Sequence, residues 1–225
     1  MLVLASASPR RRELLTQAGY TFEVRPAHIP EDPLPNEDPV AYVTRLAREK
    51  AEAVYNELAL KEHDFSRADT IEKNILGAPG PSHLGTGDSS NLTLSSTTPL
   101  TILAADTTVT LDNQILGKPS DPADAARMLR LLSGRTHQVI TGIALITATS
   151  TQVAAETTAV TFLPLTEDAI AAYIATVEPM DKAGAYAIQG RAARWIPRIE
   201  GDYFNVVGLP IALVSSLLES HQLTR

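Results

Sequence analysis

The sequence predicts an α/β protein with a mixed β-sheet. Runs of apolar and β-branched residues, typical of buried strands, alternate with segments whose apolar residues recur at three-and-four spacing, typical of amphipathic helices. The alternation has no repeat period, which favours the α/β class over a repeat array. The chain has 225 residues and is 44% hydrophobic, enough for one large domain or two small lobes with a substantial core.

The first predicted strand and helix meet at an unusual turn. Residues 1–5 form a short apolar run, Ser8 suits a helix N-cap, and Pro9 suits the first helical position. The helix would run from Arg10 to about residue 18, with Arg10–Arg12 in its first turn. The helix dipole disfavours cations there by about 0.3–1 kcal/mol each. Free backbone N–H groups and arginines together predict a phosphate site, the alternative being a solvated basic turn.

A long amphipathic helix and an insertion follow. The spacing of apolar residues over 38–60 predicts a helix. Lys50 lies on its apolar face, so it either extends to solvent or reaches a buried anion. Residues 61–99 are rich in Gly, Pro, Ser, Thr and Asn and poor in large apolar residues. We interpret them as an insertion, largely disordered or loop.

The sequence after residue 99 predicts several further strands and helices. A strand begins at residue 100, and Asp112-Asn113 marks a tight hairpin turn between residues 109–111 and 115–116. The other predicted elements are a helix from Asp121-Pro122 closed by Gly134, strands at 138–148 and 157–163, a helix capped by Thr166 and running to about 177, short strands at 185–188, 195–199 and 204–207, and a helix over 210–223.

Composition excludes several classes of protein. The net charge of −7 argues against a general binder of nucleic acids or acidic membranes. The chain has no Cys, so disulfides, thiol catalysis and Cys-based zinc sites are excluded. It contains no run of 18 apolar residues, so no membrane span is expected. Arginines follow the apolar start, the reverse of a signal peptide, and we therefore expect a cytoplasmic protein.

A carboxylate follows the apolar strand that begins at residue 100. Asp106 comes directly after this run and precedes Thr107, where α/β sheets place ligands beyond a strand end. An Asp there can hold a divalent metal or act as a base. Capping of a turn is the alternative interpretation.

Three other polar positions are weaker candidates. Lys118 leaves a predicted hairpin strand between Gly117 and Pro119, where it could face phosphate or only solvent. Gln189 lies among small residues, and its carboxamide could read the edge of a nucleobase or end an edge strand. Glu31 could join Asp106 on a metal or only solubilise a loop.

Seven segments together resemble the Maf family of nucleoside triphosphate pyrophosphatases. They are, in chain order, LASASPRRRELL, LAREKA, AADTTV, ILGKP, MLRLLSGRTHQVITG, EPMDKAGAYAIQG and EGDYFNVVGLP. They cover nearly all of the chain outside residues 61–99, and KAGAYAIQG resembles the subgroup that acts on dTTP and UTP.

The resemblance implies a single domain over residues 1–225, interrupted by the insertion at 61–99. Its fold would be related to the inosine triphosphatase group, with an elongated mixed sheet, flanking helices and two lobes around a cleft. The reaction would be cleavage between the α and β phosphates of a nucleoside triphosphate, with Mg²⁺ or Mn²⁺ as cofactor. Many members are homodimers, which makes a homodimer an expectation here.

The resemblance also carries residue roles. Asp106 matches the family's catalytic acid, as general base or metal ligand, and Glu31 lies near a second acid that would share the metal. Positions matching pyrimidine selectivity are Arg10, Thr107 and Gln189, and positions matching phosphate or cleft contacts are Ser6, Arg11, Lys50 and Lys118. Two alternatives stay open: the same reaction on CTP, 7-methyl-GTP or other nucleotides, and a nucleotide-binding regulator of cell division that does not hydrolyse.

Overall fold

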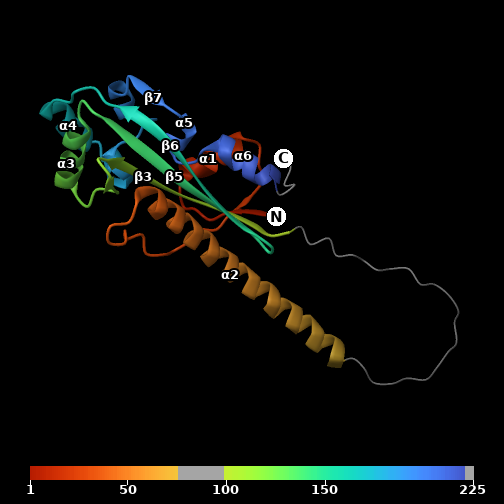
Figure 1. The fold of residues 1–225 in the computed structure, drawn as a ribbon. Helices are drawn as coiled ribbons and strands as arrows, with labels where there is room; N and C mark the ends of the chain where they lie inside the picture. Colours follow the sequence, from red (N-terminus) through yellow and green to blue (C-terminus); the bar gives the residue numbers. More distant parts are fainter. Residues whose placement is uncertain (76–98, 221–225) are drawn as a thin grey trace, which may run out of the picture.

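A mixed β-sheet with helices on both faces forms the core of the computed structural model, which describes residues 1–75 and 99–220, with side chains except for 61–75 (Figure 1). The strands are β1 (Leu2–Leu4), β2 (Glu23–Val24), β3 (Thr101–Leu111), β4 (Gln114–Leu116), β5 (Thr136–Thr147), β6 (Thr151–Thr161) and β7 (Arg198–Glu200). The helices are α1 (Pro9–Gln17), α2 (Pro39–Ile75), α3 (Pro122–Leu132), α4 (Glu167–Ile174), α5 (Tyr203–Val207) and α6 (Ile211–Ser220), with short 3₁₀ helices η1 (Glu178–Asp181), η2 (Ala183–Ala185) and η3 (Arg191–Trp195).

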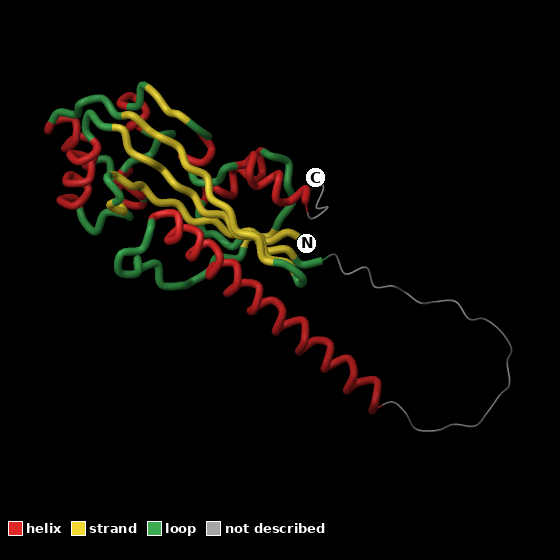
Figure 2. The backbone as a smooth tube through the Cα atoms, viewed as in Figure 1, coloured by secondary structure: helices red, strands yellow, loops and turns green. Residues whose placement is uncertain are grey.

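The strand order in the described residues is β2-β1-β3-β5-β6-β7, with β4 paired to β3. β1 is parallel to β2 and β3, whereas β3, β5, β6 and β7 form an antiparallel series. The predicted α/β class with a mixed sheet is therefore confirmed. Figure 2 shows β5 and β6 running together along the length of the body, with short strands at its edges.

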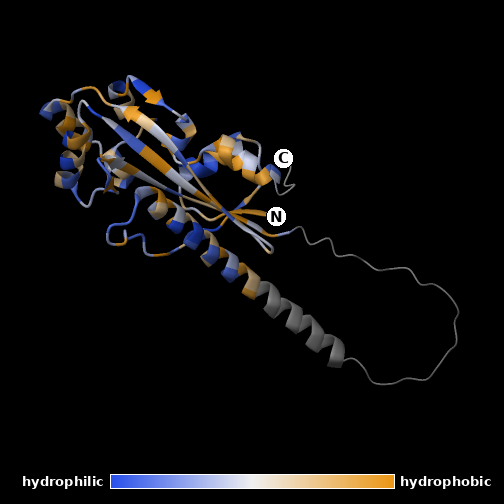
Figure 3. Cartoon of the chain, in the orientation of Figure 1, coloured by the Kyte–Doolittle hydropathy of each residue, from blue (hydrophilic) through white to orange (hydrophobic). Residues whose placement is uncertain are grey.

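Alternating residues of β3 contribute side chains to two hydrophobic clusters on opposite faces of the sheet. Ile102 and Ala104 pack with residues of α2, while Leu103 and Ala105 pack with α1 and α6. α6 is largely apolar in Figure 3, whereas α1 buries only Leu14 and Leu15. None of the described helices is both long enough and apolar enough to cross a membrane.

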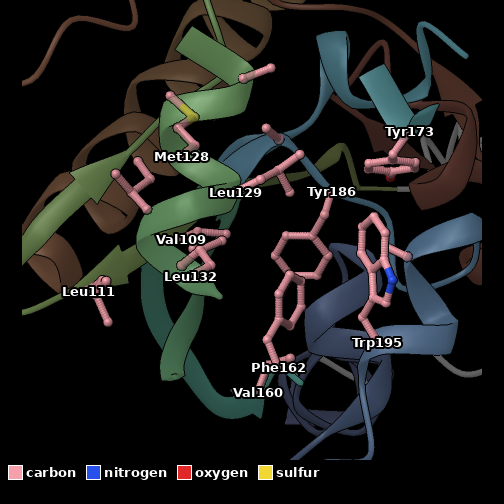
Figure 4. Packing of buried hydrophobic residues seen from close by; sticks show 14 of the residues in the cluster. Val109, Leu111, Met128, Leu129, Leu132, Val160, Phe162, Tyr173, Tyr186 and Trp195 are labelled. Atoms are coloured by element: carbon pink, nitrogen blue, oxygen red, sulfur yellow. The ribbon is translucent and has the colours of Figure 1, made fainter. Parts of the chain in front are cut away.

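A third cluster lies at the other end of β3. Val109 and Leu111 pack there with α3 and with four aromatic residues: Phe162 directly after β6, Tyr173 of α4, Tyr186 directly after η2, and Trp195 of η3, as Figure 4 shows. The polar stretch 106–108 of β3 thus lies between two groups of core residues. The hydrophobic core is thus divided on either side of the polar stretch.

Most predicted boundaries are close to the observed ones. Ser8 caps α1, accepting from Arg11 N at 3.5 Å, and Asp121 caps α3, accepting from Asp124 N at 2.8 Å. Asp112 and Asn113 form the β3–β4 hairpin turn, both with positive φ. The structure thus confirms these local signals.

Several predictions were wrong. Asp106 lies inside β3, not after its end, because the strand continues through the threonines that follow. Residues 61–75 continue α2, since this segment has no Gly or Pro and the composition that indicated a loop comes from later residues. The rest of the predicted insertion, 76–98, lies outside the described residues. The strand predicted at 157–163 begins at 151, and the helix predicted to end near 177 ends at 174.

The three short strands predicted near the C-terminus also required correction. Residues 204–207 belong to α5, because Asp202 accepts from Phe204 N at 2.7 Å and starts a helix. No strand forms at 185–188, where Gly184 and Ala185 adopt φ values of 67° and 57°. Only part of 195–199 is extended, in β7.

The close approach of α2 to the sheet depends on Gly142. Gly142 of β5 lies opposite Asp106 in the register with β3. A Cβ built on Gly142 would lie 2.7 Å from the backbone nitrogen of Thr44 and closer still to the Val43 carbonyl. The absence of a side chain therefore lets the backbone of α2 rest on the face of the sheet that carries the Asp106 side chain.

Gly142→Ala should lower the free energy of unfolding by about 1–3 kcal/mol, because the added methyl has only backbone to displace. Urea unfolding measures the change. Gly117→Ala is the matched control, since a Cβ there meets nothing within 4 Å. Equal stability of the two variants would contradict this account of helix docking.

Acid should destabilise the fold through His137. This residue is 2% exposed, it packs edge-to-face on Phe162 and Tyr186, and burial lowers its pKa to about 4. The unfolded chain, with a His pKa near 6.5, binds a proton between these values that the folded chain does not. The free energy of unfolding should therefore fall as pH drops from 6.5 to 4, by up to about 3 kcal/mol.

Urea midpoints at pH 7 and pH 4.5 check this. His137→Gln should have a smaller pH dependence than the parent protein, and His28→Gln should keep the parent's. A His137→Gln variant with the full parental dependence would rule the mechanism out.

Candidate active site

A cavity opens where β3 lacks a strand partner on one side. β1 pairs with residues 101–103, and β4 begins to pair at Val109. No described strand covers residues 104–108 on that side. A cavity of about 820 Å³ lies against this open edge, at the carboxyl end of β1, which is where open α/β sheets bind ligands.

All nine predicted site residues line this cavity: Ser6, Arg10, Arg11, Glu31, Lys50, Asp106, Thr107, Lys118 and Gln189. They come from the turn between β1 and α1, the first turn of α1, the loop before α2, α2 itself, β3, the segment after β4, and the turn before η3. The structure thus brings together residues that lie far apart in the sequence, from Ser6 to Gln189.

Lys50 holds two carboxylates at one point in the cavity. Its Nζ lies 2.6 Å from Oδ1 of Asp106 and 2.6 Å from Oε1 of Glu31. The side chains of Lys50 and Asp106 are 9% and 11% exposed, whereas that of Glu31 is 45% exposed. Of the two alternatives for Lys50, the structure therefore shows the buried anion.

Glu31 connects this buried pair to the cavity mouth. Lys118 Nζ, on an exposed side chain, lies 3.6 Å from Oε2 of Glu31. Burial alone would raise the pKa of Glu31, but hydrogen bonds and charge from Lys50 and Lys118 outweigh it and lower the pKa. The Tyr42 hydroxyl donates to the Glu31 carbonyl oxygen at 2.8 Å, which fixes the loop that carries this carboxylate.

Arg11 points into the protein rather than into open solvent. Its Nε donates to Gly208 O at 2.8 Å, and Nη2 donates to Thr107 Oγ1 at 2.9 Å. Nη1 donates to Ala105 O at 2.7 Å and to Ser6 Oγ at 3.3 Å. Four hydrogen bonds engage most of the five guanidinium N–H groups. Burial lowers the pKa of Arg11, and Asp106 opposes that shift.

The Arg11 guanidinium replaces a missing strand. On the side of β3 that faces β1, the Leu103 carbonyl accepts from Ala5 N at 2.8 Å. Carbonyls on one edge of a strand alternate, so Ala105 O is the next acceptor, and Arg11 supplies its donor. This contact satisfies a backbone group that β1 is too short to reach.

Thr107 of β3 connects the Arg11 hydrogen bonds to Thr141 on the neighbouring strand β5. Its Oγ1 accepts from Arg11 and lies 2.9 Å from Thr141 Oγ1, which donates to Asn205 O at 3.1 Å. The Thr107 hydroxyl also lies 3.5 Å from Gly208 O, so both acceptors within reach of its hydrogen, Thr141 Oγ1 and Gly208 O, belong to the protein. The Thr107 hydroxyl is therefore occupied within the protein.

Arg10 and Gln189 lie at the other side of the cavity. Arg10 is partly exposed and forms a weak ion pair with Asp181, with Nη1 3.9 Å from Oδ2. Gln189 is exposed in the turn before η3. Arg12, the third arginine of the turn, is exposed and does not line the cavity.

The lining residues that sequence reasoning missed include Lys182, Tyr42 and Tyr186. Lys182 is 15% exposed in its side chain and pairs with Asp181. The motif EPMDKAGAYAIQG was the available signal for Lys182 and Tyr186, since it contains both.

Five basic side chains and three acidic ones line the cavity, in a chain whose net charge is −7. A local excess of cations beside a helix N-terminus suits a compact polyanion. The fold and the site thus define an α/β protein built to bind a phosphorylated small molecule.

Comparison with known proteins identifies the family. The family model described as "Maf-like protein" matches residues 1–221, and the chain belongs to the Maf family. A dTTP/UTP pyrophosphatase of Koribacter versatilis is 46% identical over 217 residues, which cover 96% of this chain and 92% of that protein. Enzymes of the same name from Moorella thermoacetica and Bacillus pumilus are 45% and 39% identical, over 96% and 99% of this chain and 93% and 97% of theirs.

Arg11→Lys should destabilise the fold by about 2–4 kcal/mol, because an ammonium cannot make four divergent hydrogen bonds and leaves the Ala105 carbonyl without its donor. Urea unfolding gives the change. Arg12→Lys, at an exposed position of the same turn, is the control and should be within about 0.5 kcal/mol of the parent. If the two variants were equally stable, Arg11 would not complete the sheet edge.

Proposed function

We propose that this chain hydrolyses dTTP and UTP to the nucleoside monophosphate and pyrophosphate. The observation that carries the proposal is the buried Lys50, whose ammonium holds Asp106 and Glu31 together in a cavity lined by further cations. The relatives named dTTP/UTP pyrophosphatase support the same substrates. A triphosphate brings roughly four negative charges, so charge neutralisation and positioning should supply most of the rate enhancement.

In the proposed reaction a water oxygen attacks the α-phosphorus, and the bond from this phosphorus to the bridging oxygen breaks. Asp106 accepts the proton of the water as general base, and pyrophosphate leaves. Lys50 orients the Asp106 carboxylate through its 2.6 Å contact. Lys118, Arg10 and the amino end of α1 hold the phosphates, whereas Arg11 shapes the site with Ser6 and Thr107.

The residues present fit a divalent metal. The Asp106 and Glu31 carboxylates lie close enough to share the Lys50 ammonium, and the described residues contain no group of three or more His, Cys, Asp or Glu, so these two carboxylates are the ligands that the chain would supply. Mg²⁺ and Mn²⁺ favour such sites, with one or two carboxylates and the remaining ligands from phosphates and water. When bound, the metal would neutralise phosphate charge and polarise the reacting centre.

Base selection is proposed for Arg10, Thr107 and Gln189. Because the Thr107 hydroxyl contacts Arg11, Thr141 and Gly208 within the protein, Thr107 would act through its position and its methyl group. Gln189, exposed at the cavity, offers both a donor and an acceptor to a pyrimidine edge. A cytoplasmic location, a homodimer and the absence of nucleic-acid or membrane partners remain predictions from composition and family resemblance.

Pyrophosphate release from a panel of triphosphates tests the function. We expect turnover of dTTP and UTP with Mg²⁺ or Mn²⁺, less from CTP, dATP and 7-methyl-GTP, and none after chelation of the metal. Thermal stabilisation by dTTP without release from any member of the panel would instead indicate a nucleotide-binding regulator.

Asp106→Asn should lower kcat for dTTP by about 100-fold or more, because the amide cannot take up the proton. The amide oxygen can still accept from Lys50, so the melting temperature should stay near that of the parent. Near-parental turnover by a folded Asp106→Asn protein would remove Asp106 from the mechanism.

A further inference from the structure

The turn that carries Gln189 is irregular, and two residues outside the cavity hold it. Gly190 N donates to Ala187 O at 3.1 Å, which closes a four-residue turn with Ile188 and Gln189 at its tip. No strand or regular α-helix includes these residues. Something other than regular secondary structure must therefore fix where Gln189 points.

Tyr173 of α4 supports the first end of the turn. Its hydroxyl donates to Oε1 of Glu178 at 2.8 Å and accepts from Ala187 N at 3.1 Å. The ring is 1% exposed and packs edge-to-face on Trp195, with centroids 5.1 Å apart. Burial and the neighbouring Glu178 raise the pKa of Tyr173, so the hydroxyl keeps the proton that it donates.

Glu178 supports the second end. Oε1 accepts from Arg191 N at 3.0 Å, the residue directly after the turn. The carboxylate also lies against Gly190: a Cβ there would be 2.9 Å from Oε2 and closer still to Oε1. One hydrogen-bonded pair, Tyr173 and Glu178, thus fixes both backbone amides that flank the turn.

We propose that Tyr173 and Glu178 are positioning residues for base selection, acting through the backbone of the turn that presents Gln189. Neither residue lines the cavity, so neither touches the nucleotide. Glu178 is the first residue of the motif EPMDKAGAYAIQG, and its carboxylate holds the backbone at the end of that motif. This inference rests on the proposed function, since it needs Gln189 to read the base.

The test compares kcat/KM for dTTP with kcat/KM for dATP. Tyr173→Phe leaves Ala187 N without its partner, and Glu178→Ala leaves Arg191 N without its partner. Each should lower the dTTP:dATP ratio about threefold to tenfold, mainly through KM for dTTP. Glu178→Gln should restore most of the ratio, because the amide oxygen can still accept both hydrogen bonds. Tyr203→Phe, at an exposed tyrosine away from the cavity, should leave the ratio unchanged.

The selectivity ratio separates positioning from stability. Partial unfolding would lower kcat for both nucleotides equally and leave the ratio unchanged. Tyr173→Phe added to Gln189→Ala should have no further effect on the ratio, since the turn would then carry nothing that reads the base.

The two proposals fail in different ways. No pyrophosphate release by the parent chain would refute the proposed function. A selective parent whose ratio is unchanged in Tyr173→Phe and Glu178→Ala would overturn this inference alone. It would also be overturned if Gln189→Ala left the ratio unchanged, or if the double variant lost selectivity additively.

Discussion

The buried contact between Lys50 and Asp106 is the interaction on which the site depends. Two charges this far from solvent carry a large desolvation penalty, which good geometry and further hydrogen bonds must offset. The geometry comes from the sheet and α2 together: Gly142, opposite Asp106, has no side chain, so the helix rests directly on the strands. Glu31 completes the arrangement from a loop that Tyr42 fixes.

The second constraint is the edge of β3 beside the cavity, which no described strand pairs with and where a side chain supplies a backbone hydrogen bond. Unpaired strand edges attract other chains and leave backbone groups unsatisfied. Here β1 ends after three residues, and Arg11 donates to the Ala105 carbonyl that β1 does not reach. The arginine turn thus has two parts: Arg11 belongs to the protein's own framework, while Arg10 remains partly exposed at the cavity.

Local signals predicted most elements, and together with the family resemblance they gave nine of the residues that line the cavity, but not Tyr42, Lys182 or Tyr186. They worked where a cap or turn decides the outcome, as at Asp121 and at Asp112-Asn113. They failed at residues 204–207, because a four-residue segment is too short to show a periodicity and the Asp202 cap starts a helix there. They also misplaced Asp106, because a threonine-rich continuation of a strand resembles a turn.

The sequence by itself determined the class of fold, the set of candidate residues and the local excess of cations, because caps, periodicity and residue chemistry act over short distances. Only the tertiary structure decided what each candidate contacts. It turned Lys50 toward Asp106, bound Arg11 to the edge of β3, and joined Tyr173 and Glu178 behind Gln189. These contacts link residues far apart in the chain, and their geometry depends on how closely helices and strands pack, which no local pattern encodes.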